Sequence, residues 1–377
     1  MTGPQIIVLA TPIFFLLIGI EIVIGRRRDR NGYRLNDALS SIGLGVMSQI
    51  VGVFTAVLTL GIYVWVYERL AVWPLPAASP WTWLFGLIAY DFFYYWHHRA
   101  GHRVALFWAA HVVHHQSEDY NLSTALRQTS SGWLGGWIFY LPMAIVGFPP
   151  LVFGVVALID LLYQFWVHTE QVGKLGWFDR WFCAPSNHRV HHAVNDRYLD
   201  RNYGGVLIVW DRLFGTYAEE ERAEPCVYGT RAPLRSWNPL WANLQVYAEL
   251  ARDAWRARRW TDRLRVWWKP PGWRPVDVAA RWPKPAFTVD AFERYDPAVP
   301  RARQALAFAL FVALLATTML FLWYAHAMTW PQRVAAAAAI IAALWAVGRL
   351  GEGGREGAPL AEATASLPRE TARPSPP

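Results

Sequence analysis

The chain has 377 residues and a formal net charge of +8, with 54% hydrophobic, 17% charged and 15% aromatic residues. Soluble domains usually carry roughly 25% charged residues, so this composition excludes an ordinary soluble globule, and the abundant apolar surface excludes disorder over most of the chain. The two cysteines, Cys183 and Cys226, are too few for a secreted disulfide framework and form no CxxC zinc motif.

A membrane-spanning helix needs roughly 20 apolar residues. Apolar segments of about this length, or somewhat shorter, occupy residues 6–24, 43–66, 81–96, 133–148, 151–167, 305–325 and 334–347. Pro149 and Pro150 separate the fourth segment from the fifth, so that pair is either two short spans or one re-entrant hairpin. We therefore expect five to seven spans in an all-α, polytopic helical bundle.

The arginines at positions 26, 27, 28 and 30 directly follow the first apolar segment. A cleaved signal peptide carries its positive charges before the apolar stretch, so this order indicates a membrane anchor. The positive-inside rule then places residues 26–41 in the cytoplasm. Counting the spans onward places residues 168–304 there as well. The Ala/Arg/Trp-rich composition and the lack of a retrieval signal favour a bacterial inner membrane.

The predicted organisation has five parts. Residues 1–80 form N-terminal spans, 81–220 a histidine-rich catalytic region, 221–304 a cytoplasmic or interfacial Trp/Arg-rich segment, 305–349 a C-terminal span pair, and 350–377 a disordered tail. Tryptophan and arginine together are typical of the lipid headgroup zone. The positive charge therefore requires no nucleic-acid partner, and we predict none.

Ten of the eleven histidines lie between His97 and His192. Eight of them recur at a spacing of three or four residues, in three boxes: His98 and His102; His111, His114 and His115; and His188, His191 and His192. Residues three and four apart share one face of a helix, so each box can direct two or three ring nitrogens toward one point. His168 ends an apolar segment, and we expect it at the same membrane depth.

Neutral imidazole favours iron, copper, zinc or nickel over magnesium and calcium. Eight or nine histidines exceed the four ligands of one tetrahedral zinc ion, and the HExxH motif of zinc proteases is absent. Burying so many imidazoles without partners would be costly. We therefore predict a helical cap at the cytoplasmic face that carries a di-metal site, with two iron ions that activate O2 as the best fit.

Other polar residues are candidates to support this site. His97 points away from its neighbour His98 and is either a ligand or a residue beside one, whereas the isolated His326 is left out. Asp91 lies seven residues before His98, on the same helix face, and is expected to orient its ring. Further candidates for such contacts, each as plausibly a solvent-exposed or capping residue, are Glu118, Asp119, Asn121, Asn195 and Asp211.

The three boxes resemble those of the fatty acid hydroxylase/sterol desaturase superfamily of integral membrane di-iron oxygenases. The runs 202–205 and 210–216 are similar to the segment that follows the last box in that superfamily. Within it, residues 117–128, 163–170 and 269–273, together with the closing pair of spans, are most similar to the alkylglycerol monooxygenases.

This resemblance implies that the eight box histidines, with His168 as a ninth, hold two irons. It also implies insertion of oxygen next to the ether linkage of a glycerol lipid, which releases an aldehyde and a glycerol product, with tetrahydrobiopterin as the reductant. Arg103 departs from the subfamily pattern, which has an acidic residue there, and this weakens the substrate and pterin assignments more than the metal assignment.

We therefore expect an iron-dependent lipid monooxygenase or hydroxylase whose partners are a membrane lipid, O2 and an electron donor. In the wider superfamily the donor is cytochrome b5 or ferredoxin, and the reaction is hydroxylation or desaturation of sterols, carotenoids or acyl chains. The non-enzyme alternative is a metal transporter or sensor. That alternative predicts histidines along the interiors of the spans, whereas these histidines cluster at span ends.

Overall fold

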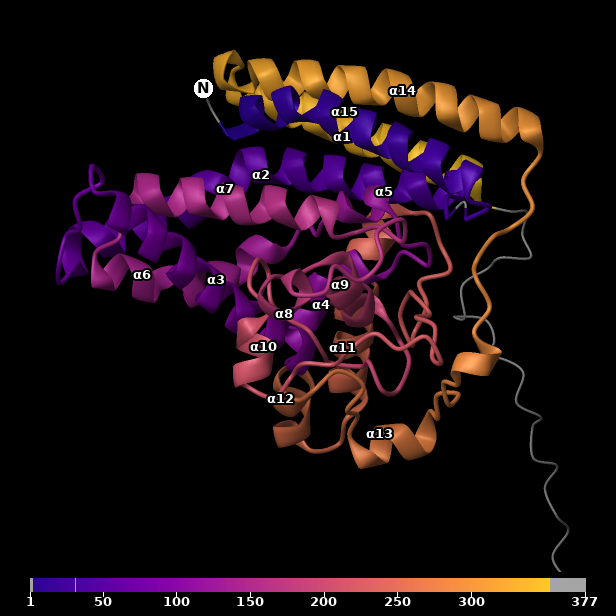
Figure 1. The fold of residues 1–377 in the computed structure, drawn as a ribbon. Coiled ribbons are helices and arrows are strands. Elements are labelled where there is room, and N and C mark those ends of the chain that lie inside the picture. Colours follow the sequence, from indigo (N-terminus) through magenta and orange to yellow (C-terminus); the bar gives the residue numbers. More distant parts are fainter. Residues whose placement is uncertain (1–2, 31, 353–377) are drawn as a thin grey trace, which may run out of the picture.

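The computed structural model describes residues 3–30 and 32–352, and within these ranges the chain is helical and contains no strand. This confirms the predicted all-α class. The predicted disordered tail lies outside the described residues from position 353 onward. Figure 1 shows two parts, a set of long helices that run roughly side by side and a cap of short helices below them.

Within the described residues, four helices are long and apolar enough to cross a membrane: α1 (Gly3–Arg27), α2 (Leu35–Leu70), α14 (Arg301–Tyr324, with the 3-10 turn η4, Ala325–Ala327) and α15 (Trp330–Gly351). They bring the first two and the last two described long helices together, because α14 and α15 pack on each other and on α2, and α14 also packs on α1. Their shared core includes Met47, Ile50, Phe311 and Leu344. The chain is thus an integral membrane protein.

A second set of helices lies beside α2: α3 (Pro80–Arg103), α6 (Leu141–Val146) and α7 (Pro150–Trp166). Of the two alternatives predicted for residues 133–148 and 151–167, a separate span at 133–148 is wrong, because these residues form two 3-10 turns, η1 (Gly132–Leu134) and η2 (Gly136–Tyr140), and the short helix α6. The re-entrant hairpin stays a prediction. Helix α7 has 17 residues, and α3 ends in polar His and Arg residues. By length and composition, four described helices therefore qualify as spans rather than the five to seven predicted.

The turn between α6 and α7 depends on Gly147, which has a φ of +119°. A Cβ atom added there would lie 2.1 Å from the carbonyl oxygen of Trp73. The chain therefore reverses tightly against the loop that follows α2, and α6 and α7 form a hairpin.

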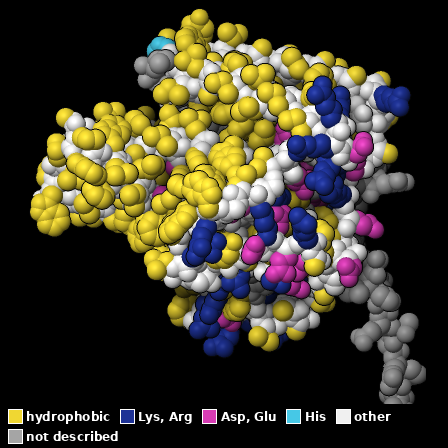
Figure 2. All heavy atoms as spheres, viewed as in Figure 1, with side chains coloured by type: hydrophobic (Ala, Val, Ile, Leu, Met, Phe, Trp, Pro, Cys, Tyr) yellow, Lys and Arg dark blue, Asp and Glu magenta, His cyan; other side chains and the backbone are white. Residues whose placement is uncertain are grey.

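The cap consists of shorter helices: α4 (Ala105–His115), α5 (Leu122–Ala125), α8 (Phe178–Trp181), α9 (Pro185–His192), α10 (Val209–Leu213), α11 (Pro239–Arg256), α12 (Trp260–Trp268), α13 (Val276–Arg281) and the 3-10 turn η3 (Val289–Ala291). Hydrophobic side chains dominate the surface of the long helices in Figure 2, whereas Lys, Arg, Asp and Glu gather on the cap. This contrast is expected where one part of a protein faces lipid and the other faces water.

Candidate metal centre

Nine of the ten clustered histidines come together in two adjoining groups. The five-histidine group contains His98, His102, His111, His115 and His191, and the four-histidine group contains His114, His168, His188 and His192. Within each group the candidate ligand nitrogens all lie within 4.8 Å of one another. Helices α3, α4 and α9 and the residues after α7 supply them, so the groups form where the long helices meet the cap.

The second and third boxes each contribute to both groups. His111 and His115 of α4 belong to the five-histidine group, while His114 belongs to the other. In α9 the division is reversed, because His188 and His192 belong to the four-histidine group and His191 to the five-histidine group. Helix geometry explains this division, since residues at +3 and +4 point about 100° apart around the axis. The expectation that each box points at one site is therefore wrong for these two boxes.

Backbone carbonyls orient four of the rings. The Nδ1 atoms of His98, His114, His168 and His191 face the carbonyl oxygens of Tyr203 (2.8 Å), Arg127 (2.8 Å), Gln164 (2.7 Å) and Arg201 (3.0 Å), respectively. A neutral imidazole that donates Nδ1–H to a carbonyl keeps its Nε2 lone pair free. These contacts therefore direct the Nε2 atoms of the four rings into the two groups.

The Nε2 atoms crowd together as metal ligands do. In the five-histidine group Nε2 of His111 lies 3.0 Å from Nε2 of both His98 and His115. In the other group Nε2 of His168 lies 3.0 Å from that of His188. Two nitrogens this close share a proton in an N–H···N hydrogen bond or a cation, and where both rings carry their proton on Nδ1, as His168 does when it donates to a carbonyl, a cation is the fitting partner.

Two orphaned atoms support the same interpretation. The Nε2 atoms of His102 and His191 are buried and have no hydrogen-bond partner among the described residues. A buried polar atom without a partner is costly, and metal coordination removes that cost. The donor set of neutral imidazoles suits iron, copper, zinc or nickel.

Burial keeps the cap histidines neutral. Desolvation, followed by the charges of neighbouring histidines, holds the pKa of His188, His191 and His192 well below the usual value. Burial likewise lowers the pKa of His114 to about 4. Since only the neutral ring offers a lone pair to a metal ion, both groups are ready to bind cations at neutral pH.

A cavity of about 380 Å³ adjoins both groups. Its lining includes His98 and His111 of one group and His114 and His168 of the other. The rest of its wall is mostly apolar and includes residues of α4 and of the segment 125–136. The long helices contribute Phe14 of α1, Val46 of α2, Leu161 of α7, and Leu315 and Met319 of α14. An apolar chain that lies in this cavity would bring its carbon atoms next to the histidines.

His97 belongs to neither group. Its ring lines the cavity and lies 5.2 Å from the ring of Phe139, and its Nδ1 is 3.4 Å from the hydroxyl of Tyr140. This histidine therefore contributes to the wall of the cavity beside the candidate metal site.

The predicted contact between Asp91 and His98 is wrong. The carboxylate of Asp91 accepts hydrogen bonds from the backbone N–H groups of Val206 (2.7 Å) and Leu207 (3.1 Å) and from Nε1 of Trp210 (2.8 Å). Two residues seven positions apart share a helix face, but they lie about 10 Å apart along the helix axis, which is too far for direct contact between their side chains. Asp91 instead anchors the loop that follows the third box.

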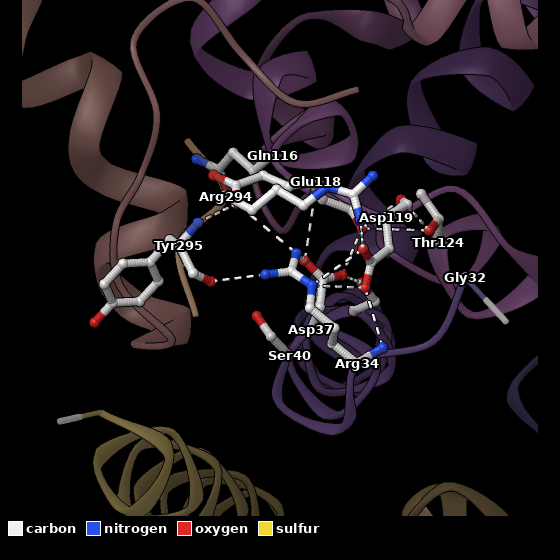
Figure 3. Close-up of polar contacts among 12 residues, drawn as sticks. Gly32, Arg34, Asp37, Ser40, Gln116, Glu118, Asp119, Thr124, Arg294 and Tyr295 are labelled. Atoms are coloured by element: carbon white, nitrogen blue, oxygen red, sulfur yellow. Dashed lines mark hydrogen bonds and ion pairs between the residues drawn. The ribbon is translucent and has the colours of Figure 1, made fainter. Parts of the chain in front are cut away.

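Glu118 belongs to a buried polar cluster that Figure 3 shows at the start of α2. Its carboxylate accepts a hydrogen bond from the backbone N–H of Tyr295 (2.5 Å) and lies 3.7 Å from the Arg34 guanidinium. Asp119 pairs with Arg34 at 3.0 Å and with Arg294 at 3.3 Å. The cluster thus joins the residues after the second box to the segment that leads into α14.

Asn195, Asn121 and Asp211 also support backbone rather than histidines. Asn195 accepts a hydrogen bond from the N–H of Val227 (2.9 Å), and Asn121 caps α5. None of the residues predicted to orient a histidine contacts one directly in the described part of the chain.

The segment from Asp200 to Tyr203 supports the candidate site, and sequence reasoning missed this contact. It supplies the carbonyls that face His191 and His98, and it is held by Asp211, whose carboxylate accepts hydrogen bonds from the N–H groups of Tyr203 (2.8 Å) and Gly204 (2.7 Å). The Asn-Tyr-Gly-Gly run at 202–205 was visible in the sequence, but nothing in it indicates that the neighbouring carbonyls reach the histidines.

Comparisons with known proteins agree with this picture. The profile of the fatty acid hydroxylase family matches residues 83–216, which include all nine histidines. Human alkylglycerol monooxygenase is 40% identical over 72% of this chain and 61% of its own length, and the zebrafish (Danio rerio) protein is 40% identical over 72% and 60%. The Xenopus tropicalis protein is 37% identical over 83% of this chain and 70% of its own length. The chain spans about 60% of the human and zebrafish relatives. No solved structure matches the chain significantly.

Proposed function

Because the chain belongs to the alkylglycerol monooxygenase family, we propose that it is a membrane-bound, O2-dependent lipid monooxygenase that holds two iron ions. The observation that carries the proposal is the pair of buried histidine groups at the end of an apolar cavity. The activity named for the relatives is oxidation of an alkylglycerol, a lipid whose chain matches such a cavity.

In this proposal one iron binds in the five-histidine group and the other in the four-histidine group. Iron suits a donor set of imidazole nitrogens and, when bound, supplies the capacity to activate O2 for attack on a C–H bond. The protein orients the rings through the carbonyls of Arg127, Gln164, Arg201 and Tyr203. Burial of the groups excludes bulk water from the oxidation.

The proposed substrate is a glycerol ether lipid. Its alkyl chain lies between α1, α2 and α14, and the carbon next to the ether oxygen lies beside the histidines that line the cavity. One oxygen atom of O2 enters a C–H bond of that carbon, and the other leaves as water after two electrons and two protons arrive from a reductant. The resulting hemiacetal separates into an aldehyde and a glycerol product.

Tetrahydrobiopterin is the proposed reductant, and a protein donor of the cytochrome b5 or ferredoxin type is the alternative. Arg103 lies at the outer side of the five-histidine group and is largely exposed, paired with Asp200. Because Arg103 is exposed, its positive charge would influence which of these reductants binds next to the five-histidine group.

We propose that the histidines lie on the cytoplasmic side of a bacterial inner membrane. Arg26 and Arg27 occupy the last turn of α1, and the guanidinium of Arg28 donates a hydrogen bond to the carbonyl of Gln171, three residues after His168. The arginine cluster and the candidate metal site therefore share one side of the membrane, and arginine-rich segments favour the cytoplasm.

The test uses the full chain in lipid nanodiscs. We expect about two irons per chain by elemental analysis, and an aldehyde from an alkylglycerol supplied with reduced pterin under air but not under argon. His114→Ala and His191→Ala remove one candidate ligand from each group and should abolish the product, whereas the control His326→Ala changes an exposed histidine of η4 and should retain it.

Zinc as the sole bound metal, or metal flux across proteoliposomes without any lipid product, would overturn the proposal. A hydroxylated or desaturated sterol, carotenoid or acyl chain in untargeted lipid analysis, with no aldehyde from the alkylglycerol, would keep the two irons and replace the substrate.

A further inference from the structure

Three histidines of the five-histidine group have Nδ1 atoms that face the same short segment, residues 200–203. His191 faces the carbonyl of Arg201 at 3.0 Å, and His98 faces the carbonyl of Tyr203 at 2.8 Å. Nδ1 of His102 lies 3.8 Å from a carboxylate oxygen of Asp200. One segment of four residues therefore lies behind three of the five rings.

His102 differs from the other rings in what it faces. Among the nine grouped histidines, all within the described residues, it is the one whose Nδ1 faces a carboxylate. The separation of 3.8 Å exceeds hydrogen-bond length, so the interaction is electrostatic. Its Nε2 atom is buried and has no partner among the described residues. A negative charge behind the ring favours the tautomer with the proton on Nδ1, which leaves the Nε2 lone pair directed into the group.

Asp200 is held in place from two sides. Its other carboxylate oxygen accepts a hydrogen bond from the Arg103 guanidinium at 2.9 Å. Its backbone takes a φ of +59°, a left-handed conformation that is uncommon for residues other than glycine. Two residues later, the side-chain amide of Asn202 donates hydrogen bonds to the carbonyls of Asn187 (3.0 Å) and Ala218 (2.8 Å). A strained residue that its surroundings hold in place is typical of functional sites.

The Arg103–Asp200 pair contributes little to folding. The side chain of Arg103 is 56% exposed and that of Asp200 29% exposed, and ion pairs this accessible stabilise a protein by about 1 kcal/mol or less. Its placement next to a candidate metal ligand therefore requires a reason other than stability.

We propose that Asp200, held by Arg103, is a positioning residue that fixes the tautomer and orientation of His102 in the five-histidine group. This inference rests on the proposed function, because it assumes that this group binds a metal ion. It assigns an electrostatic role to a carboxylate that lies outside the histidine boxes and does not itself reach the ion.

The test compares Asp200→Ala, Asp200→Asn and a control, Asp196→Ala, which removes an exposed carboxylate of the same loop. Metal retention is measured by elemental analysis after dialysis against graded chelator concentrations. We expect one of the two metals of Asp200→Ala to be lost at about 10–100-fold lower chelator concentration than in the wild type, which is the usual effect of removing the partner of a metal-ligating histidine. The amide of Asp200→Asn still offers an oxygen and should restore part of this loss.

A second readout separates positioning from folding. In the Co²⁺-loaded protein, the visible absorption bands of one of the two ions should shift in Asp200→Ala and remain unchanged in Asp196→Ala. The unfolding temperature of the metal-free protein should be the same in both variants.

Retention of both metals and unshifted bands in Asp200→Ala would overturn the inference. So would loss of both metals together with a lower unfolding temperature of the metal-free protein, because that result means a scaffolding role. If the wild-type chain itself fails to bind two metals, the proposed function fails first, and the two failures are thus distinguishable.

Discussion

Removal of the Asp211 carboxylate should disturb the five-histidine group without touching it. Asp211 is fully buried and accepts hydrogen bonds from the N–H of Tyr203 (2.8 Å), the N–H of Gly204 (2.7 Å) and the hydroxyl of Thr216 (2.6 Å). Asp211→Ala leaves these three donors without their acceptor, and each buried orphan costs about 1–3 kcal/mol. Since water and relaxation recover part of that cost, we expect a loss of about 3–6 kcal/mol, a large share of the roughly 5–15 kcal/mol that stabilises a typical fold.

The assay follows the unfolding temperature by tryptophan fluorescence together with the metal content. At about 1.3 °C per kcal/mol for a chain of 377 residues, Asp211→Ala should unfold about 4–8 °C below the wild type. It should also lose one metal before the other, because the carbonyl of Tyr203 orients His98 of the five-histidine group. Asp211→Asn keeps one acceptor oxygen and should lose about half as much stability, and Asp290→Ala, at an exposed site, serves as the control. Wild-type stability and wild-type metal content in Asp211→Ala would refute the reasoning.

Three further predictions concern the fold, its pH dependence and the cavity. Gly147→Ala should destabilise the α6–α7 hairpin by about 2 kcal/mol or more, measured as a lower unfolding temperature, because the added Cβ would lie 2.1 Å from the Trp73 carbonyl at a φ of +119°. Burial and neighbouring carboxylates raise the pKa of Glu118 to about 6, so its contribution to stability is complete below its ordinary pKa of 4.5 and is lost as the pH rises through 6. Glu118→Gln should therefore flatten the dependence of the unfolding temperature on pH between 4.5 and 6.5. An unchanged slope would contradict this. Met319→Trp should narrow the cavity and lower kcat/KM for a long-chain substrate about tenfold with unchanged iron content, whereas Leu320→Trp, at a residue of α14 that is 61% exposed, should have little effect.

The sequence was sufficient to predict which histidines gather. Helix geometry turns a spacing of three or four residues into a shared face, and that spacing is visible in the sequence. Residues at +3 and +4 share the broad face of a helix, and this brings each box to the same region. The division of the histidines between the two groups depends on how the helices are oriented relative to one another. His114 and His115 are adjacent in the chain yet belong to different groups, and only the rotation of α4 relative to α9 decides which ring points where. Local spacing thus predicts that the +3 ring diverges from the other two, whereas helix packing decides which group each ring faces.

The residues that support the candidate site were harder to predict for a related reason. Asp91, Glu118 and Asn195 lie near box histidines in the sequence, but each binds backbone from another part of the molecule: residues 206–207, 295 and 227, respectively. The partners of the histidine rings are mostly carbonyl oxygens, which every residue possesses. A pattern of side chains therefore carries no signal for them.

The candidate histidine groups and the cavity draw on different parts of the chain to different extents. All nine grouped histidines lie within residues 83–216, which match the family profile, whereas part of the cavity wall comes from α1, α2 and α14 outside that range. Changes in α14 or α1 can therefore reshape the cavity without altering the histidine groups. Under the proposed function, this separation would let one oxidising centre serve ether lipids in one protein and sterols or acyl chains in another. Variants at the cavity-lining positions of α1, α2 and α14, rather than in the histidine boxes, can therefore test the choice between the proposed substrate and its alternatives without removing a candidate ligand.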